Sequence, residues 1–412
     1  MMSISGAMVV LSRIPFTDAV AEQVRIVALV AYGVDVIVYD LSFLNKKYQN
    51  IEATVTKCPV VKIKTISEFK HRLKTFHPHV YLDLIYGLSG IQADAYHIIF
   101  RLLKKYNAQY YVLAMGTLPS TLVRDNRRSF QQIMKKIKLI KNLSVLSAYV
   151  KASCRIIGNK LIRRLIDHYQ LPLNIFSCTN EVLDSYLTRY NLSKVNVIPI
   201  HSLDYDRYLL NQNKTKPVDI PNNYCVFADD GLVAHPDFSV LNDTQKPVMA
   251  KSYQRSICQF FDRVEELTGL EVVIAAHPRV NYDASPNLFG NRKIIQGKTI
   301  QLIEHSQLVL THYSTSISYA ILYNKPLALL LTDEMIQKNY DRMSYTFSAT
   351  LGIPVFNMDE DREQNDNLAD YSNWVKDYDH YRYSYIQSKL LGDSFFWETV
   401  VKELKQDFNR EI

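Results

Sequence analysis

Three short stretches decide how this sequence folds: Tyr224-Cys-Val-Phe-Ala-Asp-Asp-Gly231, Glu271-Val-Val-Ile-Ala-Ala-His-Pro-Arg279 and Gln307-Leu-Val-Leu-Thr-His-Tyr-Ser-Thr-Ser316. In each of them an apolar run of strand length gives way to polar residues, which predicts a buried strand that ends in a loop. The polar residues are paired acids, an imidazole and a cluster of hydroxyls. Because ligands of open α/β sheets bind outside the carboxyl ends of the strands, we expect one site here for an anionic, activated substrate.

Strand and helix patterns alternate along most of the chain. Apolar runs of strand length occur at residues 7–11, 34–39, 60–66, 80–85 and 110–114, with helical spacing between them. Such β-α-β alternation predicts a parallel sheet with helices on both faces. Helices are also expected over residues 17–32 and over most of the tail, residues 374–408.

The length of 412 residues favours two domains. A polar segment with two prolines interrupts the alternation and is typical of a linker. We therefore predict an α/β fold of the GT-B type, with two Rossmann-like domains facing a cleft. The expected parts are an N-terminal domain over 1–210, a linker over 211–223, a C-terminal domain over 224–375, and a C-terminal helix over 376–412 that crosses back.

Composition excludes several classes of protein. The five cysteines are widely spaced without a CxxC pair, which predicts a reduced, cytoplasmic protein without structural zinc. No apolar run approaches the roughly 20 residues of a membrane-spanning helix. The first residues lack the basic leader of a signal peptide.

The net charge of +7 is unevenly distributed. Residues 101–165 contain fifteen Lys or Arg and one acid, Asp125. Within them a helical insertion over about 124–169 carries isoleucines on one face and basic residues around it, as in helices that lie on an anionic membrane. A pair of ordinary surface helices with extended Lys and Arg side chains gives the same pattern. No nucleic-acid reader motif accompanies the charge, so no nucleic-acid partner is expected.

The acid pair Asp229-Asp230 directly follows an apolar run. In an extended segment neighbouring side chains point to opposite faces, so one carboxylate can enter the site while the other holds the loop. A carboxylate with a raised pKa can take a proton from a sugar hydroxyl as it attacks. Gly231 allows the backbone to turn away there. An ordinary Asp-Gly turn is the competing interpretation.

His277-Pro278 and Ser314-Thr315-Ser316 follow the other two runs. The imidazole can donate to a phosphate oxygen, although the motif taken alone favours a histidine that bonds a loop carbonyl. Hydroxyls and free N–H groups at the start of a helix can bind an anion, while simple N-capping requires the same residue types.

Other motifs are weaker. The acid-x-acid groups Asp204-Tyr205-Asp206 and Asp359-Glu360-Asp361 have a form that binds metal in some nucleotide-sugar enzymes, but their positions near a linker and in an acidic loop lead us to expect no metal. His235-Pro236 is another His-Pro pair, close to Asp230; it follows no apolar strand, so we interpret it as loop, from which it could approach the acceptor. The sequence has no P-loop, GxGxxG, HExxH or GxSxG motif.

The order and spacing of these motifs resemble those of the bacterial sialyltransferase and polysialyltransferase families over residues 224–331, whereas the N-terminal half is similar only in its GT-B alternation. The resemblance implies an inverting, metal-independent glycosyltransferase that moves a nonulosonic acid (sialic, legionaminic or pseudaminic acid) from its CMP donor to a bacterial surface glycan, with the acceptor bound by the N-terminal domain. It further implies a glycan or lipid-linked glycan acceptor, and the basic helices suit peripheral contact with the cytoplasmic face of an anionic inner membrane.

The same resemblance assigns roles to residues. Asp229 or Asp230 would be the general base, with Asp229 the first choice, and His277 would contact the departing CMP phosphate. Gly231, Pro278 and the Ser314, Thr315 and Ser316 cluster would complete the donor site. Thr299 and Gln301 would approach the cytidine, where related enzymes carry a Glu for the ribose.

Several alternatives remain open at this point. A CMP-Kdo transferase of capsule assembly and a CDP-glycerol or CDP-ribitol phosphotransferase of wall-polymer synthesis share the GT-B frame. Sugar-nucleotide 2-epimerases also share it and would bind UDP. A non-catalytic scaffold of capsule assembly is the interpretation from a different class.

Overall fold

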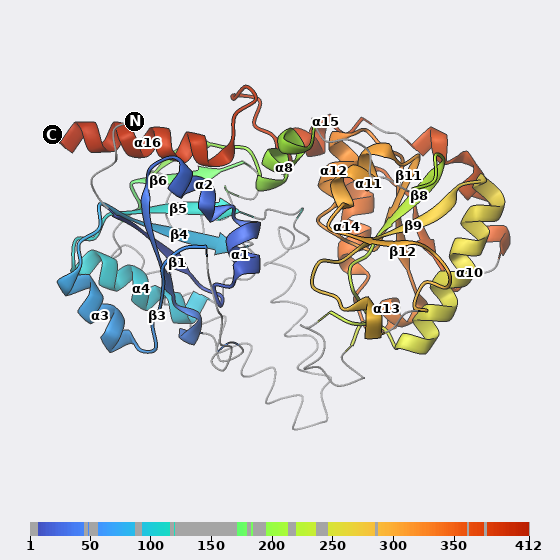
Figure 1. Ribbon diagram of the computed structural model, residues 1–412, viewed down its shortest axis with the longest axis horizontal. Helices are drawn as coiled ribbons and strands as arrows, with labels where there is room; N and C mark the ends of the chain where they lie inside the picture. The colour runs from blue at the N-terminus through green and yellow to red at the C-terminus, as the bar shows by residue number, and fades with distance from the viewer. Residues whose placement is uncertain are drawn as a thin grey trace, which may run out of the picture. The chain divides into compact units, whose positions relative to one another are not determined.

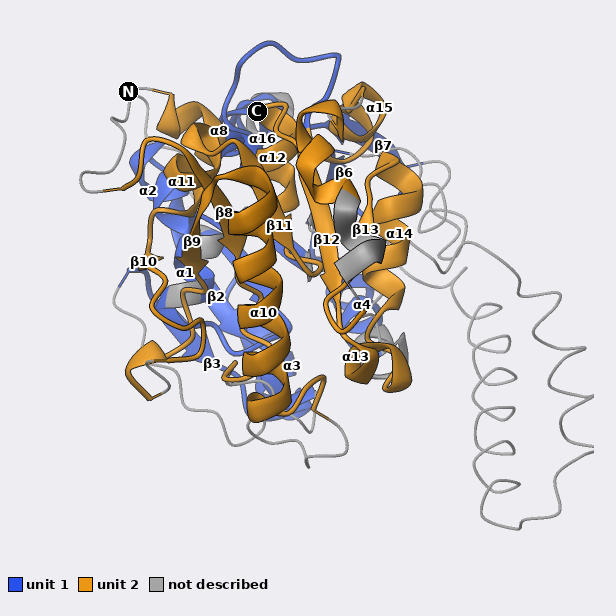
Figure 2. Ribbon diagram, turned by 90° about the vertical axis from the view of Figure 1, so that its right-hand side faces the viewer, with its two compact units in different colours: residues 1–206, 387–412 blue, residues 207–386 orange. Residues whose placement is uncertain are grey.

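The computed structural model describes residues 7–44, 48, 57–86, 93–115, 119, 171–178, 183, 195–212, 220–235, 246–284, 287–360, 362–374 and 377–411. The chain divides into two compact units, one formed by residues 1–206 with 387–412 and the other by residues 207–386 (Figure 2). The helical insertion expected over 124–169 and most of the expected linker, residues 213–219, lie outside the described residues.

Parallel strands form the sheet of the first unit. In the described residues it has seven strands in the order β3-β2-β1-β4-β5-β6-β7. Their bounds are β1 Ala7–Ser12, β2 Asp35–Asp40, β3 Val60–Lys62, β4 Val80–Tyr86, β5 Tyr110–Met115, β6 Asn174–Ser177 and β7 Asn196–Pro199. The helical segments described with it are α1 Asp18–Gln23, α2 Ile26–Ala31, η1 Ser42–Leu44, α3 Ile66–Thr75, α4 Ala93–Lys105 and α16 Phe396–Glu411, and the division between the units falls within α8 Leu203–Asn211 (Figure 1).

Alternation along the strands gives this sheet two apolar faces. Met8 and Val10 of β1 belong to the core that includes α2 and α16, whereas Val9 and Leu11 belong to the core that includes α3 and α4. The expected single helix over residues 17–32 is wrong in one respect. It is broken into α1 and α2 at Arg25, whose φ of 52° is left-handed.

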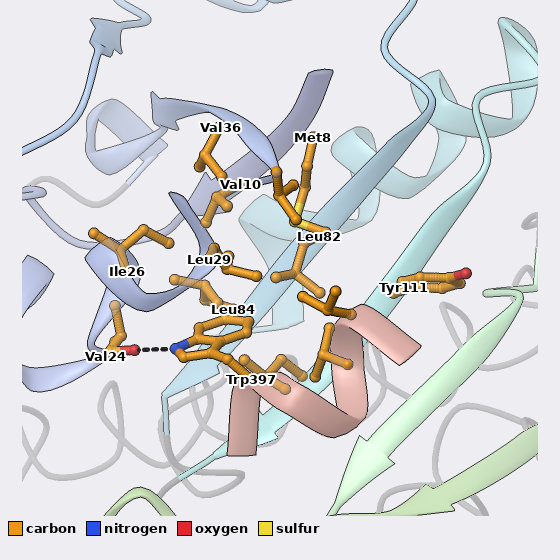
Figure 3. Close-up of a cluster of buried hydrophobic side chains, with 14 of the residues drawn as sticks. Met8, Val10, Val24, Ile26, Leu29, Val36, Leu82, Leu84, Tyr111 and Trp397 are labelled. Atoms are coloured by element: carbon orange, nitrogen blue, oxygen red, sulfur yellow. Dashed lines mark hydrogen bonds between the residues drawn. The ribbon is translucent and has the colours of Figure 1, made fainter. Parts of the chain in front are cut away.

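The C-terminal helix α16 completes the core of the first unit. Trp397 is fully buried beside Leu29 and Leu84, and its indole Nε1 donates to the carbonyl of Val24 at 2.7 Å (Figure 3). The tail is not helical throughout as expected, because residues 387–395 form no helix before α16 begins. The C-terminal segment therefore contributes to the first sheet's core although the second unit separates them in sequence.

The second unit repeats the strand order of the first. Its described residues form a six-stranded parallel sheet in the order β10-β9-β8-β11-β12-β13. The strands are β8 Tyr224–Ala228, β9 Glu271–Ala276, β10 Ile294–Gln296, β11 Leu308–Thr311, β12 Leu327–Leu331 and β13 Val355–Asn357. The helical segments are α10 Ala250–Thr268, η5 Tyr282–Ala284, α11 Thr299–His305, α12 Ile317–Leu322, α13 Asp333–Gln337, α14 Arg342–Leu351, η6 Arg362–Trp374, α15 Asp379–Tyr381 and the π-helical turn η7 Arg382–Ile386.

Helix α10 shows why this unit folds as the sequence predicts. Its apolar residues recur every three or four positions and are buried against the sheet, with Phe260 and Phe261 fully buried. Gly269 ends the helix with a left-handed φ of 67°, which only glycine adopts without strain. Fully buried strands such as β8 and β12 are apolar at every position, as parallel strands covered on both faces require.

Candidate active site

The predicted site residues come together at one edge of the second sheet. Strands β10, β9, β8 and β11 are consecutive neighbours and run parallel, so their carboxyl ends share that edge. The strand order reverses at β8, which pairs with β9 on one side and β11 on the other. Such a switch point is where open α/β sheets bind ligands.

Asp229 is buried, and both of its carboxylate oxygens accept hydrogen bonds. Oδ1 accepts from the N–H of Gly231 at 2.9 Å, and Oδ2 accepts from the hydroxyl of Tyr282 at 2.5 Å. Burial raises the pKa of Asp229, and these hydrogen bonds oppose the rise because they favour the carboxylate. Asp229 is thus held on both sides by its neighbours.

Asp230 is half-buried, and only one of its oxygens is engaged. Oδ2 accepts from the Thr311 hydroxyl at 3.1 Å and from the N–H groups of His312 at 3.0 Å and Tyr313 at 3.4 Å. Among the described residues, nothing donates to Oδ1. Burial, and secondly the charge of Asp229, raises the pKa of Asp230 to about 7, although the three donors oppose this.

Gly231 allows the β8 loop to lie against the loop that follows β9. Its φ is 69°, and a Cβ built there would lie 2.7 Å from Cγ2 of Val280 and 3.4 Å from Cβ of His235. A side chain at this position would therefore be strained and would also push the two loops apart.

His277 lies in that second loop and is half-buried. Its Nδ1 accepts from the N–H of Arg279 at 3.2 Å, so the neutral ring carries its proton on Nε2. Its ring meets that of His235 edge-on, with 4.8 Å between ring centroids. His235 lies in the loop after β8, as expected, and its ring is therefore adjacent to a residue of the loop after β9.

Tyr282 is the residue that sequence reasoning missed. Its hydroxyl accepts from the backbone N–H of His277 at 2.7 Å while it donates to Asp229. It begins the short helical turn η5, in a segment rich in Pro, Asn and Gly where no periodicity distinguishes this tyrosine from the other tyrosines of the chain.

The hydroxyl cluster forms the turn between β11 and α12. Oγ of Ser314 accepts from the N–H of Ser316 at 3.2 Å, so Ser314 caps the turn. The hydroxyls of Thr315 and Ser316 bond to no described residue. Thr315 is exposed and Ser316 half-buried, so both hydroxyls remain available for a ligand.

The β10 and β9 ends hold the remaining predicted residues. Thr299 begins α11 and is half-buried, whereas Gln301 is buried, with 6% of its surface exposed. Pro278 is exposed, and its carbonyl accepts from the side chain of Gln296 at 3.3 Å, which ties the two strand ends together.

His312 anchors the turn that holds Asp230. Its Nδ1–H donates to the carbonyl of Leu330 at 2.7 Å, and therefore its Nε2 accepts from the hydroxyl of Tyr253 at 2.9 Å. Complete burial lowers the pKa of His312 to about 4, so the ring is neutral at physiological pH. The two hydrogen bonds of the ring hold His312 in place, and its backbone N–H donates to Asp230.

One described acid of each acid-x-acid motif, Asp206 and Asp359, forms hydrogen bonds within the fold. Asp206 accepts from the N–H of Phe396 at 2.7 Å and pairs with Arg25 in the first unit. Asp359 accepts from the N–H of Asp333 at 2.8 Å and from the Ser256 hydroxyl. Within the described ranges, no three or more His, Cys, Asp or Glu residues are grouped so as to bind a metal ion.

Every helix in the described part of the chain is too short or too polar to cross a bilayer.

Comparison with known proteins shows the fold. No protein-family model matches the chain, and no curated protein has a similar sequence. The wall teichoic acid polymerase TagF aligns at 10% identity with a TM-score of 0.54, covering 100% of this chain and 91% of that chain. The UDP-GlcNAc 2-epimerase from Methanocaldococcus jannaschii aligns at 13% identity with a TM-score of 0.50, covering 97% of this chain and 99% of that chain. The expected class, two parallel-sheet α/β domains of the GT-B type, is confirmed.

Proposed function

We propose that this protein is an inverting, metal-independent glycosyltransferase that moves a nonulosonic acid from a CMP donor to a bacterial surface glycan. The observation that carries the proposal is the acid pair at the switch point of the second sheet, flanked by an imidazole on one neighbouring strand and hydroxyls on the other. An acceptor hydroxyl needs a base, and a departing phosphate needs hydrogen-bond donors.

Asp230 is the better candidate for the base, although the resemblance placed Asp229 first. Both oxygens of Asp229 accept hydrogen bonds inside the protein, whereas Oδ1 of Asp230 accepts none from the described residues. A pKa of about 7 also suits a base that works near neutral pH. In the reaction, the acceptor oxygen would bond to the anomeric carbon, the bond from that carbon to the CMP phosphate would break, and the hydroxyl proton would pass to Asp230.

His277 and the β11–α12 turn would stabilise the departing CMP. The Nε2–H of His277 can donate to a phosphate oxygen, and Thr315 and Ser316 supply further donors. A single phosphate that leaves with its charge neutralised by fixed donors requires no chelated metal. Gly231 and Pro278 would shape the wall of this donor site, and Thr299 would approach the cytidine.

The acceptor side of the proposal rests on charge. The excess of basic residues over 101–165 suits an enzyme that works on a lipid-linked or polymeric glycan at an anionic inner membrane, on its cytoplasmic face. We propose peripheral contact through these residues.

A CDP-glycerol or CDP-ribitol phosphotransferase is the second candidate. The contact between His235 and His277 favours it, because two adjacent imidazoles suit a donor with two phosphates. The shared fold with a wall teichoic acid polymerase is compatible with either candidate.

Calorimetric titration of the protein with CMP, CDP and UDP, in the presence of EDTA, distinguishes these possibilities. We expect CMP to bind most tightly and His277→Ala to lose this binding. CMP-activated nonulosonic acids and CMP-Kdo would then be compared as donors. A preference for CDP would favour the phosphotransferase. Tighter binding of UDP would favour an epimerase, and no nucleotide binding would favour a scaffold, so either result would refute the proposal.

A further inference from the structure

Tyr282 connects two loops of the site through one oxygen atom. Its hydroxyl accepts from the backbone N–H of His277 at 2.7 Å and donates to Oδ2 of Asp229 at 2.5 Å. His277 follows β9 and Asp229 follows β8, so the hydroxyl of Tyr282 joins the ends of two adjacent strands. The tyrosine ring is half-buried and lies near Phe289, with 6.3 Å between ring centroids.

The directions of these two hydrogen bonds are fixed by chemistry. An amide N–H can only donate, so the tyrosine oxygen accepts from His277 and must give its own proton to Asp229. The Gly231 N–H donates to the other oxygen of Asp229. With both oxygens bonded, the side chain of Asp229 has one orientation, and the backbone from which Asp230 extends is fixed with it.

We propose that Tyr282 is a positioning residue, whose hydroxyl holds Asp229 and the His277 loop as one unit and so fixes Asp230 and the His277 ring for reaction. The role in transfer rests on the function proposed above. The role in holding Asp229 does not, because it follows from the two hydrogen bonds alone.

Replacing Tyr282 by Phe removes only the oxygen. The ring still packs near Phe289, but a buried carboxylate oxygen loses its donor and the His277 amide loses its acceptor. Unpaired buried polar groups are costly, so Asp229 would gain a proton more readily or move. Displacement by about 1 Å at a reacting group can cost roughly 100-fold in rate.

Tyr224→Phe is the matched control. Tyr224 is also buried in the second unit, and its hydroxyl donates to the carbonyl of Leu302 at 2.7 Å. It begins β8, at the opposite end of the strand from Asp229. Loss of this hydroxyl tests the effect of removing a buried hydrogen bond from the same unit without touching Asp229, Asp230 or His277.

The first measurement needs no activity. Protein labelled with 13C at the aspartate carboxyl carbon is titrated by NMR, with Asp229→Asn and Asp230→Asn identifying the two signals. The groups that face Asp229 are Asp230, Tyr253 and Tyr282. We expect Tyr282→Phe to raise the pKa at which Asp229 titrates by about one unit or more, because the carboxylate loses one strong hydrogen bond. Tyr224→Phe should leave it in place.

The second measurement uses transfer from the CMP donor. We expect Tyr282→Phe to lower kcat roughly 10-fold to 100-fold, with the donor KM changed less than about threefold and Tyr224→Phe close to the wild type. In an Asp229→Asn background, Tyr282→Phe should add little further loss, because coupled residues are not additive.

The outcomes separate the two proposals. An unchanged Asp229 titration together with an unchanged kcat would overturn the role of Tyr282. A full additional loss in the Asp229→Asn background would also overturn it, because the hydroxyl would then act by another route. If the wild type transfers no CMP-linked sugar but the titration moves, the proposed function has failed and the positioning of Asp229 stands.

Discussion

Each sheet has an acid where its first and fourth strands in sequence order meet, but the two acids belong to different strands and have different partners. Both have the strand order 3-2-1-4-5-6 from their edge, with a seventh strand added in the first. In the first sheet, Asp83 of β4 faces the guanidinium of Arg13, which follows the neighbouring strand β1 and donates to both carboxylate oxygens. In the second sheet, Asp230 follows β8 and accepts only neutral donors from the end of β11.

The two acids differ in whether a cation pairs with the carboxylate. Both Arg13 and Asp83 are buried; burial raises the pKa of Asp83, and the guanidinium opposes part of this rise. Such a closed pair has no oxygen left to accept a proton from a substrate. No cation pairs with Asp230 in the residues that the structure describes, and burial therefore raises its pKa without that compensation. Where the first and fourth strands meet, the first sheet thus holds its acid in an ion pair, whereas the described residues of the second sheet leave its acid without a cation.

The largest expected effect is on catalysis. Asp230→Asn should lower kcat roughly 100-fold to 10,000-fold, because it removes the proposed base while keeping the size of the side chain. CMP affinity, measured by calorimetry, should stay within about threefold, since the donor is held by other residues. Asp83→Asn is the matched control on the first sheet, and we expect it to lower the free energy of unfolding rather than kcat. A normal kcat for Asp230→Asn would refute the assignment of the base.

The next effect is on stability of the first unit. Arg13→Met should lower its free energy of unfolding by about 3–5 kcal/mol, because it leaves the Asp83 carboxylate buried without its partner. Urea denaturation measures this change. Combining it with Asp83→Leu removes both charges and should restore much of the stability. If the double variant is no more stable than Arg13→Met alone, the unpaired charge is not the cause.

The sequence predicted most of the second unit because its signals are local. Each of β8, β9 and β11 is an apolar run followed by a polar residue, and Gly269 marks the end of α10. The neighbourhood of these strand ends then follows from the general behaviour of parallel sheets. For this reason the sequence alone is enough to group Asp229, Asp230, His277 and the hydroxyl cluster at one edge of the sheet.

What the sequence could not predict depends on loops that meet in space. Tyr282 and His235 have no periodic pattern, and each matters through a partner on another loop. The choice between Asp229 and Asp230 depends on which oxygens accept hydrogen bonds. The break of the first helix at Arg25 lies beside a contact with the C-terminal helix, because Trp397 donates to the carbonyl of Val24, and no local signal encodes that contact.

The smallest effect is a pH dependence that sharpens the comparison between the sheets. The pKa of Asp230 is about 7 in the folded chain and near its ordinary value when unfolded, so the folded state binds the extra proton. The resulting stability is present at low pH and is lost as the pH rises through 7. Asp230→Asn lacks this loss, so its advantage over the wild type should grow between pH 5 and pH 8, on the order of 2 kcal/mol. His312, with its pKa lowered to about 4, changes stability in the opposite sense as the pH falls, but both proteins contain it and the difference removes its contribution. Urea denaturation at the two pH values measures the difference, and an advantage independent of pH would mean that Asp230 is ionised throughout the range, as a paired acid would be.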